Sequence, residues 1–321
     1  MSTDQRPLTG NPHDPEQRGE LIGIGGQYTV HDIGNGRVMK IPNSMDGSRR
    51  FVGGYGSHVL KMKRHKPLEE TAQQRDHSIP HVLRLAARYP VLYEALARPD
   101  AAPGLCFTQD RVKPLRDLIP SASPDEIRGF LDGFADVCQL CWRYGIHDNI
   151  LFFVVNNAID ASGKVVMVDF GEVGLDTPFV AECAEGRKWE TSDGLLKGFL
   201  PDEYHAYYFQ AMKDRLSGGN FERHWATDLD ELDREIIRGP KLKSRREDIP
   251  GLVEQILERA NREEGWEIAG VAPDVMDFML ACTWGGSGVV LQNLLYRMGE
   301  SCSGAIIEVA DLPGYLQTRG D

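Results

Sequence analysis

Two segments place charged side chains where they could act on a phosphate ligand. Asp169 opens an Asp-Phe-Gly triplet after Lys164–Val168, which we predict to be a strand. A carboxylate at a strand end is suited to hold Mg²⁺ on nucleotide phosphates. Lys40 lies among apolar residues in a second predicted strand, Arg37–Ile41, where its ammonium could serve as a point charge for phosphate. A chance turn and an outward-facing lysine are the alternatives.

A glycine-rich segment, GIGGQYTV at 23–30, precedes this lysine. It matches most of the pattern G-x-G-x-x-G-x-V, with Tyr28 in the third glycine position. Glycines at such a turn let backbone amides approach phosphates, although hairpin geometry alone also explains them. The flanking strands argue against a dinucleotide site, whose glycines open a helix. Three glycines, and the valine expected over the adenine, are candidate cofactor-binding residues: Gly23, Gly25, Gly26 and Val30.

These segments together resemble the protein-kinase-like superfamily, which includes protein kinases and the aminoglycoside and choline phosphotransferases. The resemblance spans roughly residues 19–175 and is carried by GIGGQYTV, VMK, FTQDRVKPLRDLI, YGIHDNILFFVVNN and VDFGE. It implies an α+β fold of two lobes, a small β-rich N-lobe and a larger α-helical C-lobe, with MgATP between them. By this resemblance Lys40 would contact the phosphates, Asp169 would bind the metal, and Glu69 or Glu70 would orient the lysine. Alternatively, the two glutamates are only acidic residues in the first turn of a helix, where a negative charge is favourable.

The catalytic loop departs from the family pattern, which places an Asp base five residues before a metal-binding Asn. Asp148 follows a long predicted helix, but the next suitable residues, Asn156 and Asn157, come eight and nine positions later. Aligning Asn149 instead would put Tyr144 at the base position, and a tyrosine supplies no carboxylate. We therefore expect Asp148 to be the base and Asn156 to be a metal ligand. Asn157 is the second candidate for the metal ligand.

The resemblance implies a kinase-like phosphotransferase that moves the γ-phosphoryl group of ATP to a hydroxyl of an unidentified protein or small-molecule acceptor. The irregular catalytic loop and Tyr28 favour an alternative, a pseudokinase-like protein that binds nucleotide or a partner without transfer. Nucleotidyl transfer at the same site is a third possibility. No Ala-Pro-Glu triplet follows Asp169, which favours a compact, atypical kinase.

The elements that must position these residues follow from local signals. Gly34-Asn35-Gly36 predicts a hairpin, and Ser123–Glu126 predicts a capping box that opens a helix through about Tyr144. We expect a flexible tail at 1–18, an N-lobe at 19–112 and a helical C-lobe at 113–321. Further expected elements are a helix over 67–76, a strand over Ile150–Val155 and helices over 202–216, 228–238, 250–263 and 273–299.

Composition narrows the classes of partner. The 321 residues carry 36 Lys and Arg against 48 Asp and Glu, a formal charge of −12. That balance argues against nucleic acid and against anionic lipid as partners. No apolar stretch approaches the roughly 18 residues of a membrane helix, and six Cys form no disulfide framework, so a cytoplasmic location is expected.

Two local patterns remain outside this site. Cys138 and Cys141 form a C-x-x-C inside a helical pattern, where we expect buried packing rather than redox chemistry. Lys241, Lys243, Arg245 and Arg246 form a basic run, either a solvated loop or a dock for an acidic partner, and Lys61–Lys66 is a second such run.

Overall fold

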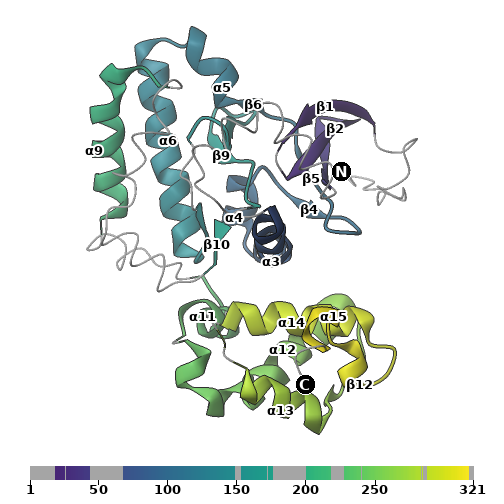
Figure 1. Ribbon diagram of the computed structural model, residues 1–321. Coiled ribbons are helices and arrows are strands. Elements are labelled where there is room, and N and C mark those ends of the chain that lie inside the picture. The colour runs from purple at the N-terminus through teal and green to yellow at the C-terminus, as the bar shows by residue number, and fades with distance from the viewer. Residues whose placement is uncertain are drawn as a thin grey trace, which may run out of the picture. The chain divides into compact units, whose positions relative to one another are not determined.

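The computed structural model divides the chain into two compact units, which are described separately (Figure 1). Unit 1 comprises residues 1–143, 147–174 and 183–224, and unit 2 comprises 144–146, 175–182 and 225–321. The residues that the structure describes are 19–25, 27–43, 68–148, 153–171, 173–175, 200–217, 228–239, 241–282, 284 and 288–317. The expected tail at 1–18 lies outside them.

Unit 1 contains a five-stranded antiparallel sheet in the order β1-β2-β3-β5-β4. The three strands predicted around the glycines are confirmed. Gly34, Asn35 and Gly36 all have positive φ, the left-handed backbone that a tight hairpin requires. Lys40 pairs with Val30 on one side and with Phe107 on the other, so it lies on a central strand. The strands are β1 (Glu20–Ile24), β2 (Tyr28–Gly34), β3 (Arg37–Pro42), β4 (Asp100–Ala101) and β5 (Phe107–Asp110).

The helix after the sheet is longer than the sequence predicted. α3 (Leu68–Arg88) continues through Pro80 to Arg88, and α4 (Pro90–Ala95) follows it. A proline inside a helix removes one backbone hydrogen bond and disfavours helix in the preceding residue. The apolar residues around Pro80 are nevertheless fully buried, so tertiary packing outweighs the local signal. They include Ile79, Val82 and Leu85.

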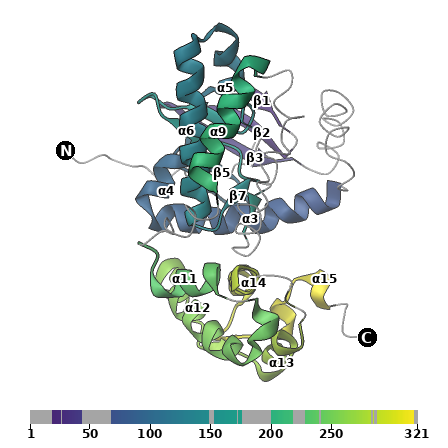
Figure 2. The ribbon, with the colours of Figure 1, turned by 90° about the vertical axis from the view of Figure 1, so that its left-hand side faces the viewer.

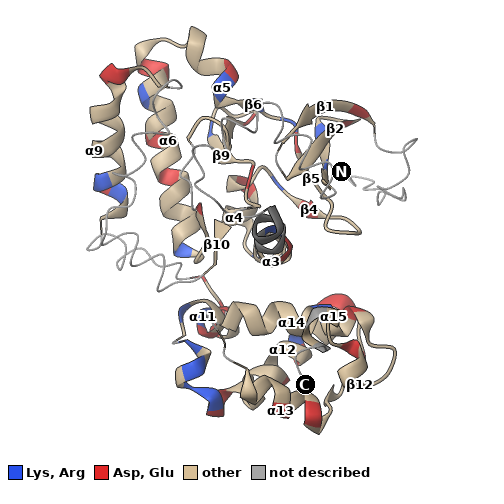
Figure 3. Cartoon of the chain, viewed as in Figure 1, with Lys and Arg blue, Asp and Glu red and all other residues tan. Residues whose placement is uncertain are grey.

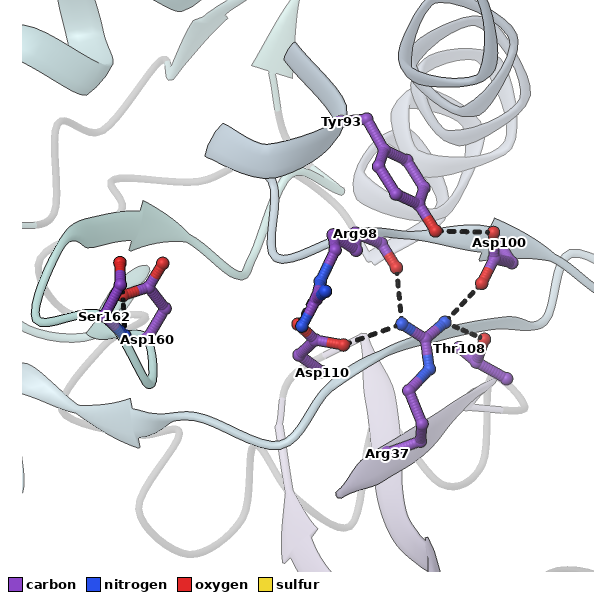
Figure 4. A network of polar contacts seen from close by, with 8 residues as sticks. All are labelled: Arg37, Tyr93, Arg98, Asp100, Thr108, Asp110, Asp160 and Ser162. Carbon is purple, nitrogen blue, oxygen red and sulfur yellow. Dashed lines mark hydrogen bonds and ion pairs between the residues drawn. The ribbon is translucent and has the colours of Figure 1, made fainter. Parts of the chain in front are cut away.

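A network of charged and polar side chains links strands β3, β4 and β5 (Figure 4). The Arg37 guanidinium on β3 donates to Asp100 at 2.5 Å, to Asp110 at 2.9 Å and to the Thr108 hydroxyl at 2.6 Å. Tyr93 of α4 donates to the same Asp100 at 3.0 Å. Strands β3, β4 and β5 are therefore joined by side chains as well as by backbone hydrogen bonds.

Unit 1 also contains a helical layer, in which α6 and α9 lie side by side (Figures 1 and 2). The predicted capping box is confirmed: the Ser123 N–H donates to the Glu126 carboxylate at 2.7 Å, and the Glu126 N–H donates to the Ser123 hydroxyl at 3.3 Å. The helices are α5 (Leu115–Leu118), η2 (Ile119–Ser121), α6 (Pro124–Arg143), η4 (Asp202–Tyr204) and α9 (His205–Leu216).

Two small antiparallel sheets carry the loops of the candidate site. One has the order β6-β8-β9, and the other pairs β7 with β10. The strand predicted over Ile150–Val155 is wrong at 153–155, which form a turn, and 150–152 lie outside the described residues. The apolar side chains of Phe153 and Val154 are buried within that turn, which explains the pattern without a strand. The strands are β6 (Lys113–Pro114), β7 (His147–Asp148), β8 (Asn157–Ile159), β9 (Val165–Met167) and β10 (Val173–Gly174).

Unit 2 is mainly helical and is held by a buried ion pair. Arg259 donates to Asp233 at 2.6 Å and to Asp230 at 2.7 Å, and Asp233 is 0% exposed. The helix predicted over 273–299 is two helices, α13 and α14. The elements are α11 (Glu231–Arg238), η6 (Leu242–Ser244), η7 (Arg246–Asp248), α12 (Ile249–Glu264), β11 (Gly270–Val271), α13 (Pro273–Ala281), α14 (Gly288–Ser301), β12 (Ile306–Ile307), η8 (Val309–Asp311) and α15 (Gly314–Gln317).

The architecture belongs to the α+β class, as the sequence predicted. Most strand pairs are antiparallel, and the helices follow the strands in blocks rather than alternating with them. In the described part of the chain, no helix has the length and apolar character needed to cross a membrane.

Candidate functional site

Lys40 projects from β3 into the interior of unit 1. Its side chain is buried, and its ammonium donates a hydrogen bond to the backbone carbonyl of Val168, 128 residues away. The ammonium also lies 5.6 Å from the centre of the Phe107 ring. Burial lowers the pKa of Lys40, and the nearby Asp169 carboxylate opposes that shift. The sheet and the Asp-Phe-Gly triplet, far apart in the sequence, therefore meet at this lysine.

Asp169 follows β9 at the point where the strand ends, as its sequence context predicted. The side chain is half-buried and accepts a long hydrogen bond, 3.4 Å, from the Gly171 N–H. Its backbone N–H donates to the carbonyl of Asn156 at 3.3 Å. The carboxylate thus lies near the Lys40 charge and beside the loop that carries Asn156.

Asn156 is the asparagine that lies beside Asp148. Its side-chain amide donates to the Asp148 carboxylate at 3.0 Å. Asn157 faces the other way, because its amide donates to the Phe153 carbonyl at 3.1 Å and its side chain is 0% exposed. Asp148 itself is 2% exposed and sits on β7, which pairs with Val173 of β10.

These contacts connect four of the predicted site residues into one network. Asn156 reaches Asp148 through its side chain and Asp169 through its backbone carbonyl. Lys40 joins the network through Val168. A cation, two carboxylates and an amide oxygen are thereby brought together, which is a donor set for phosphate and for a hard divalent cation.

The donor set fits Mg²⁺ held jointly with phosphates. Among the described residues, no three His, Cys, Asp or Glu side chains gather as a self-sufficient metal site. Mg²⁺ seldom needs one, since it is usually bound through one or two carboxylates, retained waters and substrate phosphates. Asp169, with Asn156, meets that requirement.

The glycine-rich turn is closed by internal hydrogen bonds. The Gly25 N–H donates to the Tyr28 carbonyl at 2.8 Å, and the Asn43 side chain donates to the Gly25 carbonyl at 2.8 Å. In this arrangement the Gly25 amide is already engaged. Gly26 lies outside the described residues. Gly23 and Val30 are half-buried and face each other across β1 and β2.

Arg75 of α3 was not identified from the sequence, and its side chain donates hydrogen bonds to the backbone beside this turn. Arg75 is 8% exposed, and it donates to the backbone carbonyls of Gln27 at 3.3 Å and Asn43 at 3.4 Å. Its guanidinium lies 5.8 Å from the centre of the Tyr28 ring. Arg75 also pairs with the neighbouring Asp76 carboxylate at 2.9 Å. Nothing in the spacing of α3 singled out this arginine, because its partners distant in the sequence are backbone carbonyls. The expected partners of Lys40, Glu69 and Glu70, lie in the first turn of α3, where the structure describes no side chains.

An aromatic column fills the space behind these polar groups. Tyr28 packs edge-to-face on Phe107, with ring centres 5.3 Å apart, and Phe107 packs on Phe170 at 5.1 Å. Phe170 comes directly after Asp169, so the column fixes the metal-ligand candidate relative to the sheet. Tyr28 and Val30 alternate with polar residues on β2, but β5 has Phe107 as its one apolar residue, so little in the sequence signalled this contact.

Comparison with known proteins points to a different family from the one the motifs resemble. Residues 243–321 match the AAA+ ATPase lid domain family. The chain is 37% identical over 68 residues to the Nif-specific regulatory protein of Herbaspirillum seropedicae, covering 21% of this chain and 12% of that protein. It is 26% identical over 160 residues to the DNA-binding transcriptional regulator NtrC of Escherichia coli, covering 48% and 32% respectively.

A third relative extends the same group. The transcriptional regulatory protein ZraR of Salmonella typhi is 28% identical over 102 residues, which cover 32% of this chain and 22% of that protein. The chain spans at most about a third of the length of these three curated relatives. The family match begins after residues 19–175, the stretch that carried the motifs.

These findings correct the sequence-based assignment. The prediction of a protein-kinase-like phosphotransferase with a hydroxyl acceptor is wrong, because the matches are to an AAA+ lid domain and to NtrC-type regulators. The pseudokinase-like alternative is wrong for the same reason, because it assumed the same family. A glycine turn, a strand lysine and an Asp-Phe-Gly turn are each short, and motifs of that length arise for backbone reasons alone.

The exclusion of nucleic acid as a partner is also wrong. One of the relatives, NtrC of Escherichia coli, is named as a DNA-binding transcriptional regulator. The exclusion rested on the overall charge of −12. Net charge is a sum over the whole chain, so an acidic protein can still carry a local basic surface.

Proposed function

We propose that the chain is an ATP-binding and ATP-hydrolysing regulatory protein whose nucleotide site lies in unit 1. The observation that carries this proposal is the connected set of Lys40, Asp169, Asn156 and Asp148. The match to an AAA+ ATPase lid domain supports the same ligand, since that family name denotes ATPases.

The sequence contains no P-loop, and this favours a nucleotide site built from the residues of unit 1. A P-loop of the form G-x-x-x-x-G-K-[S/T] is the usual phosphate cradle of many ATPases. The 321 residues contain no such segment; the one Gly-Lys pair, Gly163-Lys164, is followed by Val165. We therefore assign phosphate binding to Lys40 and to the oxygen ligands that accompany it, with the antiparallel sheet and the helical layer acting as two lobes of unit 1.

Each residue of the set has a distinct role in this proposal. Asp169 and Asn156 hold Mg²⁺, and Lys40 exchanges the Val168 carbonyl for a phosphate oxygen. Asp148 orients a water molecule and accepts its proton as the water oxygen bonds to the γ-phosphorus and the bond to the β–γ bridging oxygen breaks, releasing ADP and phosphate. Catalysis of this kind consists of positioning and electrostatic stabilisation, so few residues are needed.

Two matched variants test this assignment. Asp169→Asn should abolish Mg²⁺-dependent ATP binding, measured by isothermal titration calorimetry. Asp148→Asn should retain binding within a few-fold while phosphate release falls by at least 100-fold, as expected for loss of a general base. Full ATP hydrolysis by the Asp169→Asn variant, or absence of Mg²⁺-dependent ATP binding by the wild-type chain, would contradict the proposal.

A basic segment of unit 2 supports a second function, contact with DNA. Lys and Arg residues are frequent at the end of α11 and between α11 and α12, where the cartoon is blue (Figure 3). Four of them are exposed: Arg238, Lys241, Lys243 and Arg246. Burial lowers the pKa of Arg238, and the positive charge of Arg234 adds to this shift. Arg245 is different, since it is buried and paired with Glu235 and Asp248.

Exposed cations suit the phosphate backbone of DNA, and the relative named as a DNA-binding regulator makes DNA the partner to test. Fluorescence anisotropy with a labelled duplex should show binding that weakens as salt rises. The double variant Lys241→Glu, Lys243→Glu should lower both the affinity and the slope of its salt dependence. Equal binding by this variant and the wild type would exclude the segment as the contact.

A further inference from the structure

The hydroxyl group of Tyr28 is buried and has no hydrogen-bond partner among the residues that the structure describes. Tyr28 begins β2 and is 4% exposed. Within the described part of the chain, its hydroxyl makes no hydrogen bond. Most buried hydroxyls are hydrogen-bonded, because taking such a group out of water without replacing its partner is unfavourable. The fold therefore carries a donor that it does not use.

Packing accounts for the ring of Tyr28 but not for its hydroxyl. The ring packs edge-to-face on Phe107, with an interplanar angle of 78°, and Arg75 lies over its face. A phenylalanine would make both contacts and would bury no unpaired oxygen. A purely structural role therefore leaves the oxygen atom unexplained.

The surroundings of the hydroxyl belong to the candidate nucleotide site. Burial raises the pKa of Tyr28; the Arg75 guanidinium opposes this, and the carboxylates of Asp169 and Asp76 and the Cys106 thiol add to it. The hydroxyl therefore stays protonated at neutral pH. The Phe107 ring, on which the Tyr28 ring packs, has its centre 5.6 Å from the Lys40 ammonium and also packs on Phe170, the neighbour of Asp169. A protonated phenol can donate to a ligand oxygen.

Other donors of this region are engaged within the protein. The Gly25 N–H donates to the backbone carbonyl of Tyr28 itself, and the Lys40 ammonium donates to Val168. Tyr28 occupies the third glycine position of the glycine-rich segment, where the pattern would otherwise bring backbone to phosphate. Its side chain can supply a donor that the closed turn does not.

We propose that Tyr28 is a ligand-contacting residue of the nucleotide site, and that its hydroxyl donates a hydrogen bond to a phosphate oxygen of ATP bound beside Lys40 and Asp169. This inference rests on the proposed function of unit 1. It assigns a role to a side chain that departs from the glycine pattern, and it gives a partner to a hydroxyl that has none among the described residues.

The test compares the wild-type chain with Tyr28→Phe, which removes one oxygen and keeps the ring. Calorimetric titration with MgATP should give a Kd about tenfold higher for the variant, the size expected for one hydrogen bond to a charged group. Titration with adenosine should give the same Kd for both. Without ligand, the unfolding midpoint of the variant should be equal to or higher than that of the wild type, because an unpaired buried oxygen has been removed.

Tyr93→Phe is the matched control. The Tyr93 hydroxyl donates to Asp100 at 3.0 Å in the network of Figure 4, so its loss should lower the unfolding midpoint and leave the MgATP Kd unchanged. Equal MgATP affinity of Tyr28→Phe and the wild type would overturn the inference and leave the proposed function intact. A loss that appears equally with adenosine would also overturn it. Absence of MgATP binding by the wild type would overturn the proposed function itself.

Discussion

The side-chain amide of Asn156 donates a hydrogen bond to the Asp148 carboxylate at 3.0 Å, although the two residues are eight positions apart in the sequence. The backbone carbonyl of Asn156 accepts from the Asp169 N–H at 3.3 Å. One asparagine therefore contacts both acidic residues of the proposed site, Asp148 at its carboxylate and Asp169 at its backbone, which makes it the most informative residue to change.

Asn156→Ala should weaken Mg²⁺-dependent ATP binding by at least tenfold and leave the unfolding midpoint nearly unchanged, because Asn156 is only half-buried. Asn157→Ala should do the reverse. It removes a fully buried amide that donates to Phe153, at a cost of about 1–3 kcal/mol in stability. Mg²⁺ titrations and thermal melts of both variants check this. Identical profiles for the two would contradict the distinction.

Lys40→Met should abolish phosphate binding yet stabilise the ligand-free chain at neutral pH. Burial lowers the pKa of Lys40 below its ordinary value of 10.5, so the unfolded chain binds the proton more tightly than the folded one. The penalty for the buried charge is present at neutral pH and disappears as pH rises through the folded pKa towards 10.5. Chemical denaturation at several pH values should show the stability gap between the variant and the wild type narrowing as pH rises. A gap that widens would refute this.

Arg259→Ala should destabilise unit 2 by about 3–5 kcal/mol, because it leaves the buried Asp233 carboxylate without its cation. Arg262 lies one turn further along α12 on the exposed side, and Arg262→Ala is the control, with an expected change within about 0.5 kcal/mol. Urea denaturation followed by circular dichroism measures both. Comparable losses in the two variants would show that the buried pair is not the cause.

Cys138 and Cys141 should be inert in the folded chain. Both thiols are buried in α6, and burial raises the pKa of Cys141 to about 12 and that of Cys138 well above its usual value. Little thiolate is present near neutral pH, and the thiolate is the reactive form. A thiol reagent at pH 8 should modify both only after unfolding, with mass spectrometry assigning the sites. Rapid labelling of either in the native chain would contradict the packing interpretation of the C-x-x-C.

Features with local causes could be predicted from the sequence. The Gly34–Gly36 hairpin, the Ser123–Glu126 capping box and the α+β class all depend on residues close together in the chain. The strand predicted over Ile150–Val155 failed at 153–155, because a buried turn has the same apolar composition as a buried strand. The family assignment failed for a related reason, since short motifs describe local backbone shape and not ancestry.

The sequence by itself determined which residues could do chemistry: a strand lysine, an Asp after a strand, and an Asp with two asparagines downstream. Only the tertiary structure decided how they are used. Neighbouring side chains point in different directions, so Asn156 meets Asp148 while Asn157 turns into the core. Lys40 donates to the carbonyl of Val168 because chain segments 128 residues apart pack together, and no local spacing in the sequence encodes such a contact.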